Sequence, residues 1–167
     1  TSLFPEFSLL DQVLLGAHTR FDTKPAQAIF RTKPYRQEDA AQRERAADLL
    51  KFMGLLDVAQ APASAISSAQ QRLLMIATAL ATEPRVLLLD EPAAGMVAKE
   101  RAELSEIILR IRDRGVAVLV IEHHMGLIME VCERIAVLNF GQKIADGTPA
   151  QVRADPAVID AYLGTEH

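Results

Sequence analysis

The chain has 167 residues, of which 50% are apolar, and it carries a formal net charge of −4 at pH 7. This composition predicts a folded chain with a sizeable core, excludes a largely disordered one, and gives no argument for a nucleic-acid partner. The single cysteine, Cys132, excludes an intramolecular disulfide framework and fits a reducing compartment. No apolar run approaches the roughly 20 residues that span a bilayer as a helix.

The first half of the chain is predicted to be mainly helical. Apolar residues fall at helical spacing from Ser8 to Leu15, and Gly16 offers a C-terminal stop. A connector that contains two prolines and several basic residues follows. Helices are then predicted over Glu38–Met53 and Gln71–Ala81, with a loop of small residues between them.

In the second half, short apolar runs alternate with amphipathic stretches. The runs Val86–Leu89 and Val116–Ile121 are too short for helices and predict buried strands. The other predicted elements are helices over Lys99–Arg114 and Met125–Arg134, a hairpin that turns at Asn139–Gln142, and two last helices that start at Thr148 and Asp155 and end before Gly164. Fully apolar strands separated by helices predict an α/β fold with a parallel sheet covered on both faces.

Ionisable side chains stand at the ends of both apolar strands. Asp90 and Glu91 follow the first strand, and the second ends in Glu122, His123 and His124. Ligands of parallel sheets bind at the carboxyl ends of the strands. Asp90 suits Mg²⁺, which typically takes one or two carboxylates plus phosphate oxygens, and Glu91 suits a general base that acts on water. The alternative is that these acids only cap a strand and bind helix N-termini.

A zinc site built from Glu122, His123, His124 and Cys132 is a second alternative. Adjacent residues on a strand point to opposite faces, which disfavours a metal shared by the two histidines. Cys132 lies on an apolar helix face and is predicted to be a buried structural thiol. The remaining histidines, His18 and His167, have no partners by spacing and are predicted to lie on the surface.

Three segments resemble motifs of ABC transporter ATP-binding subunits. "VLLLDEPAAGM" is similar to the Walker B strand and its loop, "ISSAQQ" stands where that family has its LSGGQ-type signature, and "VLVIEHHM" is similar to the switch-histidine strand. The tail "ADGTPAQVRADPAVIDAYLG" resembles the subunits of branched-chain amino acid importers. The resemblance implies a partial P-loop NTPase (RecA-like) core with a mainly helical subdomain, ATP and Mg²⁺ as cofactors, and transport of branched-chain amino acids or related solutes.

The resemblance also implies roles for single residues. Asp90 would bind Mg²⁺, Glu91 would be the general base, and His123 would contact the γ-phosphate of ATP. The signature positions, which in this family meet the ATP of the opposite subunit, are Ser67, Ser68, Ala69 and Gln70, and Gly95–Ala98 stands at the D-loop. The implied partners are transmembrane permease subunits and a second ATP-binding subunit, on the cytoplasmic face of the cell membrane.

The resemblance further divides the chain into three parts. Residues 1–82 correspond to the helical subdomain with the signature-like loop. Residues 83–147 correspond to a part of the RecA-like core with the Walker B and switch-histidine strands. Residues 148–167 correspond to a C-terminal helical segment.

The chain departs from the family pattern in ways that bear on activity. The phosphate-binding loop GxxxxGK[ST] and the Q-loop glutamine are absent from these residues, and we expect both to lie upstream of Thr1. Ala69 replaces the last signature glycine, Val97 and Ala98 replace Asn-Pro, and His124 replaces Asp. We therefore expect a fragment that is inactive as an ATPase alone. One alternative is a non-hydrolysing ABC-like module that docks on membrane or partner subunits. Another is a DNA-repair ABC protein, which the importer-like tail disfavours.

Overall fold

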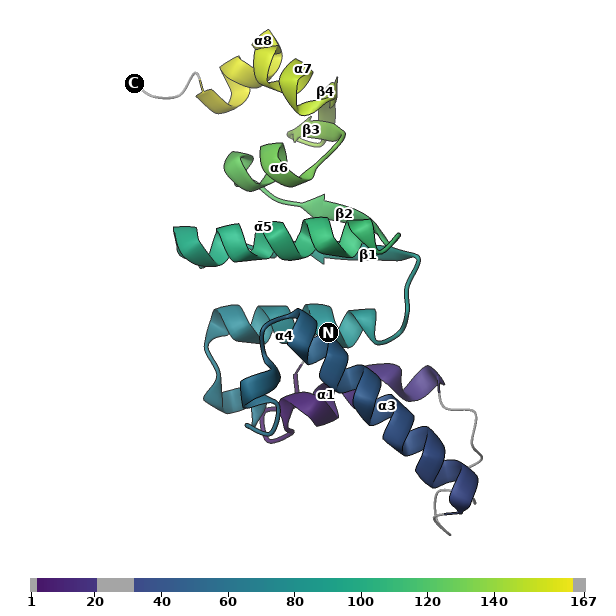
Figure 1. The fold of residues 1–167 in the computed structure, drawn as a ribbon. Coiled ribbons are helices and arrows are strands. Elements are labelled where there is room, and N and C mark those ends of the chain that lie inside the picture. Colours follow the sequence, from purple (N-terminus) through teal and green to yellow (C-terminus); the bar gives the residue numbers. More distant parts are fainter. Residues whose placement is uncertain (1–2, 21–31, 164–167) are drawn as a thin grey trace. The chain divides into compact units, whose positions relative to one another are not determined.

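The computed structural model describes residues 3–20 and 32–163 (Figure 1). The chain divides into two compact units, one of residues 1–88 with 111–119 and the other of residues 89–110 with 120–167. The predicted positions of Gly164 and His167 lie outside the described residues, as does the connector over 21–31. Among the helices of the described part, none combines the length and the apolar character that crossing a membrane requires.

The first unit is built on three packed helices, α1 (Leu9–Gly16), α3 (Lys33–Phe52) and α4 (Ser68–Leu80) (Figure 1). Helix α1 contacts both α3 and α4, and each helix contributes a fully buried leucine: Leu9, Leu50 and Leu74. Short 3-10 turns lie at Ala17–Arg20, Leu56–Val58 and Ala63–Ala65. Helix α3 begins at Lys33 rather than at Glu38 because the proline that suggested a connector lies in its first turn, where proline is tolerated.

Two glycines end or follow helices of this unit for different reasons. Gly54 has a φ of 72°, and the N–H groups of Gly54 and Leu55 donate to the carbonyls of Lys51 and Leu50, which is a Schellman motif. Gly16 instead lies against α4. A Cβ atom at Gly16 would lie 2.3 Å from the carbonyl oxygen of Thr78. The predicted end at Gly16 is therefore correct in place, but the glycine is required for close packing on α4 rather than for a left-handed cap.

Strands β1 (Val86–Asp90) and β2 (Ala117–Ile121) pair with each other. The N–H of Ala117 donates to the carbonyl of Arg85 at 3.0 Å, and the N–H of Glu91 donates to the carbonyl of Ile121 at 2.8 Å. Both strands therefore advance in the same direction, which confirms the predicted parallel pairing.

The predicted burial of both strand faces is wrong in this structure. Leu87 and Leu89 are buried, but Val86 is 56% exposed and Leu88 is 65% exposed. Alternate residues of a strand share a face, so β1 has one covered and one open face. The prediction failed because an apolar run shows what a strand can bury, whereas burial also requires an element that covers it.

In the second unit, the antiparallel hairpin of β3 (Ile135–Asn139) and β4 (Gln142–Gly147) packs with the short helices that follow it (Figure 1). These are α7 (Pro149–Ala154) and α8 (Pro156–Val158), which continues as a π-helical turn over Ile159–Leu163. The buried core consists of Ile128, Ile135, Val137, Ala145, Val152 and Val158. The capping box predicted at Thr148 is present: Thr148 and Gln151 each accept a backbone N–H from the other.

Helices α5 (Ala98–Asp113) and α6 (Met125–Val131) precede and follow β2 along the chain. Ser105 of α5 donates from its hydroxyl to a carboxylate oxygen of Glu130, one residue before the end of α6, at 2.8 Å. Helix α6 is shorter than predicted and does not reach Arg134, because Cys132 is already extended, with φ −91° and ψ 136°.

Candidate functional site

Asp90 is the last residue of β1, and its side chain is exposed. Among the residues that the structure describes, no hydrogen-bond donor or cation contacts its carboxylate. Both oxygens are therefore free to accept from a ligand. An exposed carboxylate at the carboxyl end of a parallel strand has the donor chemistry that Mg²⁺ prefers.

Glu91, the next residue, has a left-handed backbone with φ 44°. This conformation is unusual for a residue with a Cβ, and such strain costs about 1–3 kcal/mol when the surroundings enforce it. Two hydrogen bonds hold Glu91 there: its N–H donates to Ile121, and its carbonyl accepts from the N–H of Ala94 at 3.2 Å. The chain thus turns sharply at the end of β1, directly after Asp90.

His123 follows β2 by two positions, and its side chain lies against Glu91. The Nδ1 atom of His123 is 3.5 Å from Oε1 of Glu91, and both side chains are more than half exposed. Two residues that the sequence predicted to act on one ligand are therefore neighbours at the carboxyl ends of paired strands. Their catalytic roles remain predictions.

Glu122 precedes His123 and has the opposite environment, with only 1% of its side chain exposed. Its Oε1 accepts from the N–H of Ala93 at 2.9 Å, and its Oε2 accepts from the N–H groups of His123 and His124 at 3.0 and 3.2 Å. The sequence placed Glu122 among the strand-end groups near one ligand and in the zinc alternative, but it did not predict these backbone contacts. The available signal was an acid placed directly between an apolar strand and the start of a helix.

His124 is the N-cap of α6, and its Nδ1 accepts from the N–H of Leu127 at 3.4 Å. ABC ATP-binding subunits usually have aspartate at this position, and aspartate is a common N-cap residue, so His124 takes over the same capping role. With His124 and Glu122 both engaged by backbone N–H groups, the zinc alternative loses two of its ligands. Within residues 3–20 and 32–163, no three or more His, Cys, Asp or Glu side chains gather as a metal site.

Cys132 is half-buried beside the core of the second unit, where burial raises the pKa of its thiol. A raised pKa leaves less of the reactive thiolate at neutral pH. The environment of Cys132 thus supports the structural role predicted for it. His18, the other isolated residue that is described, is exposed, as expected.

The signature-like residues lie at the start of α4 in the first unit. Ser67 is the N-cap, its hydroxyl accepts from the N–H of Gln70 at 3.2 Å, and its own N–H donates to the side chain of Gln70 at 3.0 Å. Ser68 is exposed, and Ala69 is partly buried. Gln71, which the sequence analysis did not single out, fixes the preceding loop by donating from Nε2 to the carbonyl of Ala63 at 3.0 Å.

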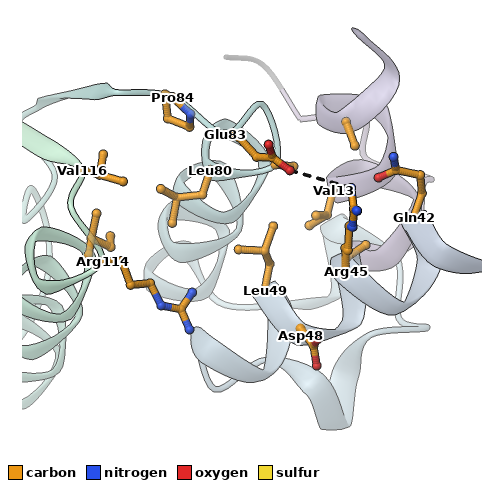
Figure 2. Close-up of a pocket in the computed structure, with 14 residues that line it drawn as sticks. Val13, Gln42, Arg45, Asp48, Leu49, Leu80, Glu83, Pro84, Arg114 and Val116 are labelled. Atoms are coloured by element: carbon orange, nitrogen blue, oxygen red, sulfur yellow. Dashed lines mark ion pairs between the residues drawn. The ribbon is translucent and has the colours of Figure 1, made fainter. Parts of the chain in front are cut away.

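A separate cavity of about 600 Å³ lies within the first unit (Figure 2). Apolar side chains such as Val13, Leu49 and Leu80 line it together with charged residues. Arg45 forms an ion pair with Glu83 at 3.8 Å, drawn as a dashed line in Figure 2, and Arg114 stacks on the ring of Phe52 at 3.7 Å. None of the residues predicted for the site lines this cavity.

Comparisons with known proteins match nearly the whole chain. A family model described as ABC transporter matches residues 1–94, and one described as branched-chain amino acid ATP-binding cassette transporter matches residues 142–167. The high-affinity branched-chain amino acid transport ATP-binding proteins BraF of Pseudomonas aeruginosa and LivG of Escherichia coli K12 are each 40% identical over 163 residues. That alignment covers 97% of this chain and 64% of each relative.

Other relatives show the breadth of the likeness. The lipopolysaccharide export system ATP-binding protein LptB of Haemophilus influenzae is 31% identical, over 99% of this chain and 63% of its own. The ADP conformation of MJ1267, an ATP-binding cassette of an ABC transporter, superposes with a TM-score of 0.75 at 28% identity. The superposition covers 96% of this chain and 64% of that structure. The chain thus spans somewhat less than two thirds of the length of these relatives.

Proposed function

Because this chain belongs to the ABC transporter family, we propose that it supplies the hydrolytic residues of an ATP-binding subunit that drives an importer of branched-chain amino acids or related solutes. The match of residues 142–167 to the branched-chain amino acid model supports the importer class. BraF and LivG, which are branched-chain amino acid transport ATP-binding proteins, support the same solutes. The likeness to LptB shows that membership of the family alone leaves the solute open.

The observation that carries the proposal is the contact between Glu91 and His123, 3.5 Å apart, with Asp90 directly before Glu91 at the end of β1. In this proposal, Asp90 binds Mg²⁺, which neutralises phosphate charge when ATP is bound. Glu91 accepts the proton of the attacking water, since its carboxylate is more than half exposed and so accessible to that water. His123 contacts the γ-phosphate and the same water and so aligns them with Glu91.

The proposed partners follow from the same family. Ser67, Ser68, Ala69 and Gln70 at the N-terminus of α4 reach the ATP of a second ATP-binding subunit, because helix N-termini favour phosphate. The pair of subunits docks on transmembrane permease subunits at the cytoplasmic face of the membrane. The methyl group of Ala69 crowds the approach of phosphate to the backbone, where glycine leaves room.

The test uses a chimera that joins the part of Escherichia coli LivG outside the 64% alignment to this chain. Glu91→Gln keeps the size of the side chain but removes the base, so we expect ATP binding to persist while kcat falls by about 100-fold or more. Glu106→Gln makes the same chemical change at an exposed position of α5 and is the matched control. Unchanged hydrolysis in Glu91→Gln would refute the assignment of the base.

A second candidate is a non-hydrolysing module that docks on partner subunits, favoured by Ala69 at the signature glycine. Calorimetry of the 167-residue chain with ATP measures how tightly these residues bind the nucleotide by themselves. We expect no binding tighter than about millimolar, which corresponds to about 4 kcal/mol, because these residues hold no GxxxxGK[ST] loop. In the chimera, Ala69→Gly should raise the ATPase activity; hydrolysis absent from both chimeras would favour the docking module.

A further inference from the structure

We propose that Glu122 is a positioning residue whose buried carboxylate holds together the two loops that carry Glu91 and His123. This proposal rests on the proposed function for the roles of Glu91 and His123. The hydrogen bonds of Glu122 that hold the loops all lie within the described residues of the second unit. In this proposal, Glu122 itself contacts neither the γ-phosphate nor the attacking water.

The hydrogen bonds of Glu122 divide between two loops. Its Oε1 accepts from Ala93, 29 residues earlier in the chain and two residues after Glu91. Its Oε2 accepts from the backbone of His123 and His124. One rigid group of three atoms therefore fixes the backbone on both sides of the contact between Glu91 and His123.

The chemistry of these contacts explains why a carboxylate is needed. A buried carboxylate costs several kcal/mol unless its oxygens are satisfied, and three N–H groups satisfy those of Glu122. Hydrogen bonds to an ionised acceptor are roughly twice as strong as neutral ones. The same carboxylate also lies 3.8 Å from Nδ1 of His123, the ring atom that faces Glu91.

Glutamine cannot reproduce this arrangement. It has one carbonyl oxygen and one NH₂ group, so its amide can accept on one side only. Its NH₂ then faces either the N–H of Ala93 or the N–H groups of His123 and His124, donor against donor. One loop loses its anchor in either orientation. A displacement of about 1 Å in a group that aligns a reaction can lower the rate about 100-fold.

The first measurement is amide hydrogen exchange by NMR on the 167-residue chain, without nucleotide. Glu122→Gln should speed the exchange of the Ala93 amide or of the His123 and His124 amides by about tenfold or more. The matched control is Glu130→Gln, because Glu130 accepts from the Ser105 hydroxyl and a glutamine keeps an oxygen for that bond. Glu130→Gln should leave the exchange of these three amides unchanged. Unchanged exchange in Glu122→Gln overturns the proposal.

The second measurement separates positioning from a general loss of stability. In the LivG chimera, Glu122→Gln should lower kcat by about tenfold or more while KM for ATP changes less than about twofold. An equal loss of kcat in Glu130→Gln, or a rise of KM without a fall of kcat, overturns the proposal. If Glu91→Gln retains turnover, the proposed base falls instead, and the amide exchange still decides whether Glu122 holds the loops.

Discussion

Replacing Gly16 by alanine tests the packing of α1 on α4. An ideal Cβ at this position would lie 2.3 Å from the carbonyl oxygen and 2.9 Å from Cγ2 of Thr78. Real Cβ atoms do not come within 3.0 Å of another heavy atom, so one of the two helices has to move. The closest atom belongs to the backbone of α4, where rotation of a side chain brings no relief.

Two effects of opposite sign decide the outcome. Alanine is better than glycine inside a helix by about 1 kcal/mol, and the gain at the last residue of α1 is smaller. Overpacking of a well-packed contact costs about 1–3 kcal/mol, and a clash with the backbone belongs at the upper end of that range. The packing effect is larger, so we expect Gly16→Ala to destabilise the chain by about 1–2 kcal/mol.

Urea unfolding followed by circular dichroism measures this change in the 167-residue chain. Gly126→Ala in α6 is the matched control, because its Cβ would meet no backbone atom within 4 Å, only Cε1 and Nδ1 of the His124 side chain at 3.2 and 3.4 Å. That control should be neutral or stabilised by up to about 1 kcal/mol. A midpoint of Gly16→Ala that rises together with that of Gly126→Ala would show that α1 is not in this close contact with α4.

Two other predictions concern the C-terminal half. Thr148→Ala removes a capping box in which Thr148 and Gln151 bond to each other's backbone, and should cost about 1 kcal/mol of the free energy of unfolding, measured by urea titration. Hydrogen bonds from Arg134 and Lys143 lower the pKa of Asp146 to about 2, below the value of about 3.9 in unfolded chains. Because the folded pKa is the lower one, Asp146 contributes stability above about pH 4 that is lost as the pH falls towards 2. Acid titration of Asp146→Asn should lack this part of the pH dependence; identical acid transitions in both chains would contradict it.

Features of the fold that depend on residues close together in the sequence could be predicted. The capping box at Thr148 needs only four consecutive residues, and the hairpin after Ile135 needs two apolar runs and a turn. The early start of α3 at Lys33 was missed because proline indicates a connector and also suits a first helical turn. Local chemistry alone does not distinguish the two.

For the candidate site, the sequence predicted that Glu91 and His123 would be neighbours but not how they are held. Asp90, Glu91 and His123 were placed together because they end two apolar strands that pair in parallel. The role of Glu122 could not be predicted in the same way, because its partner Ala93 lies 29 residues away and offers only a backbone N–H. Every residue except proline has a backbone N–H, so the residue type does not reveal which N–H groups act as donors. The strained φ of Glu91 likewise appears only when the turn is built.

The open face of β1 has a consequence for the behaviour of the chain in solution. Val86 and Leu88 project on the same side of an extended strand and are each more than half exposed. Neighbouring apolar side chains on an exposed strand are a typical starting point for aggregation and for capture by chaperones. Sulfate strengthens such association and low urea weakens it. The apolar run that carries Asp90 to the site thus also presents an open apolar face to the solvent.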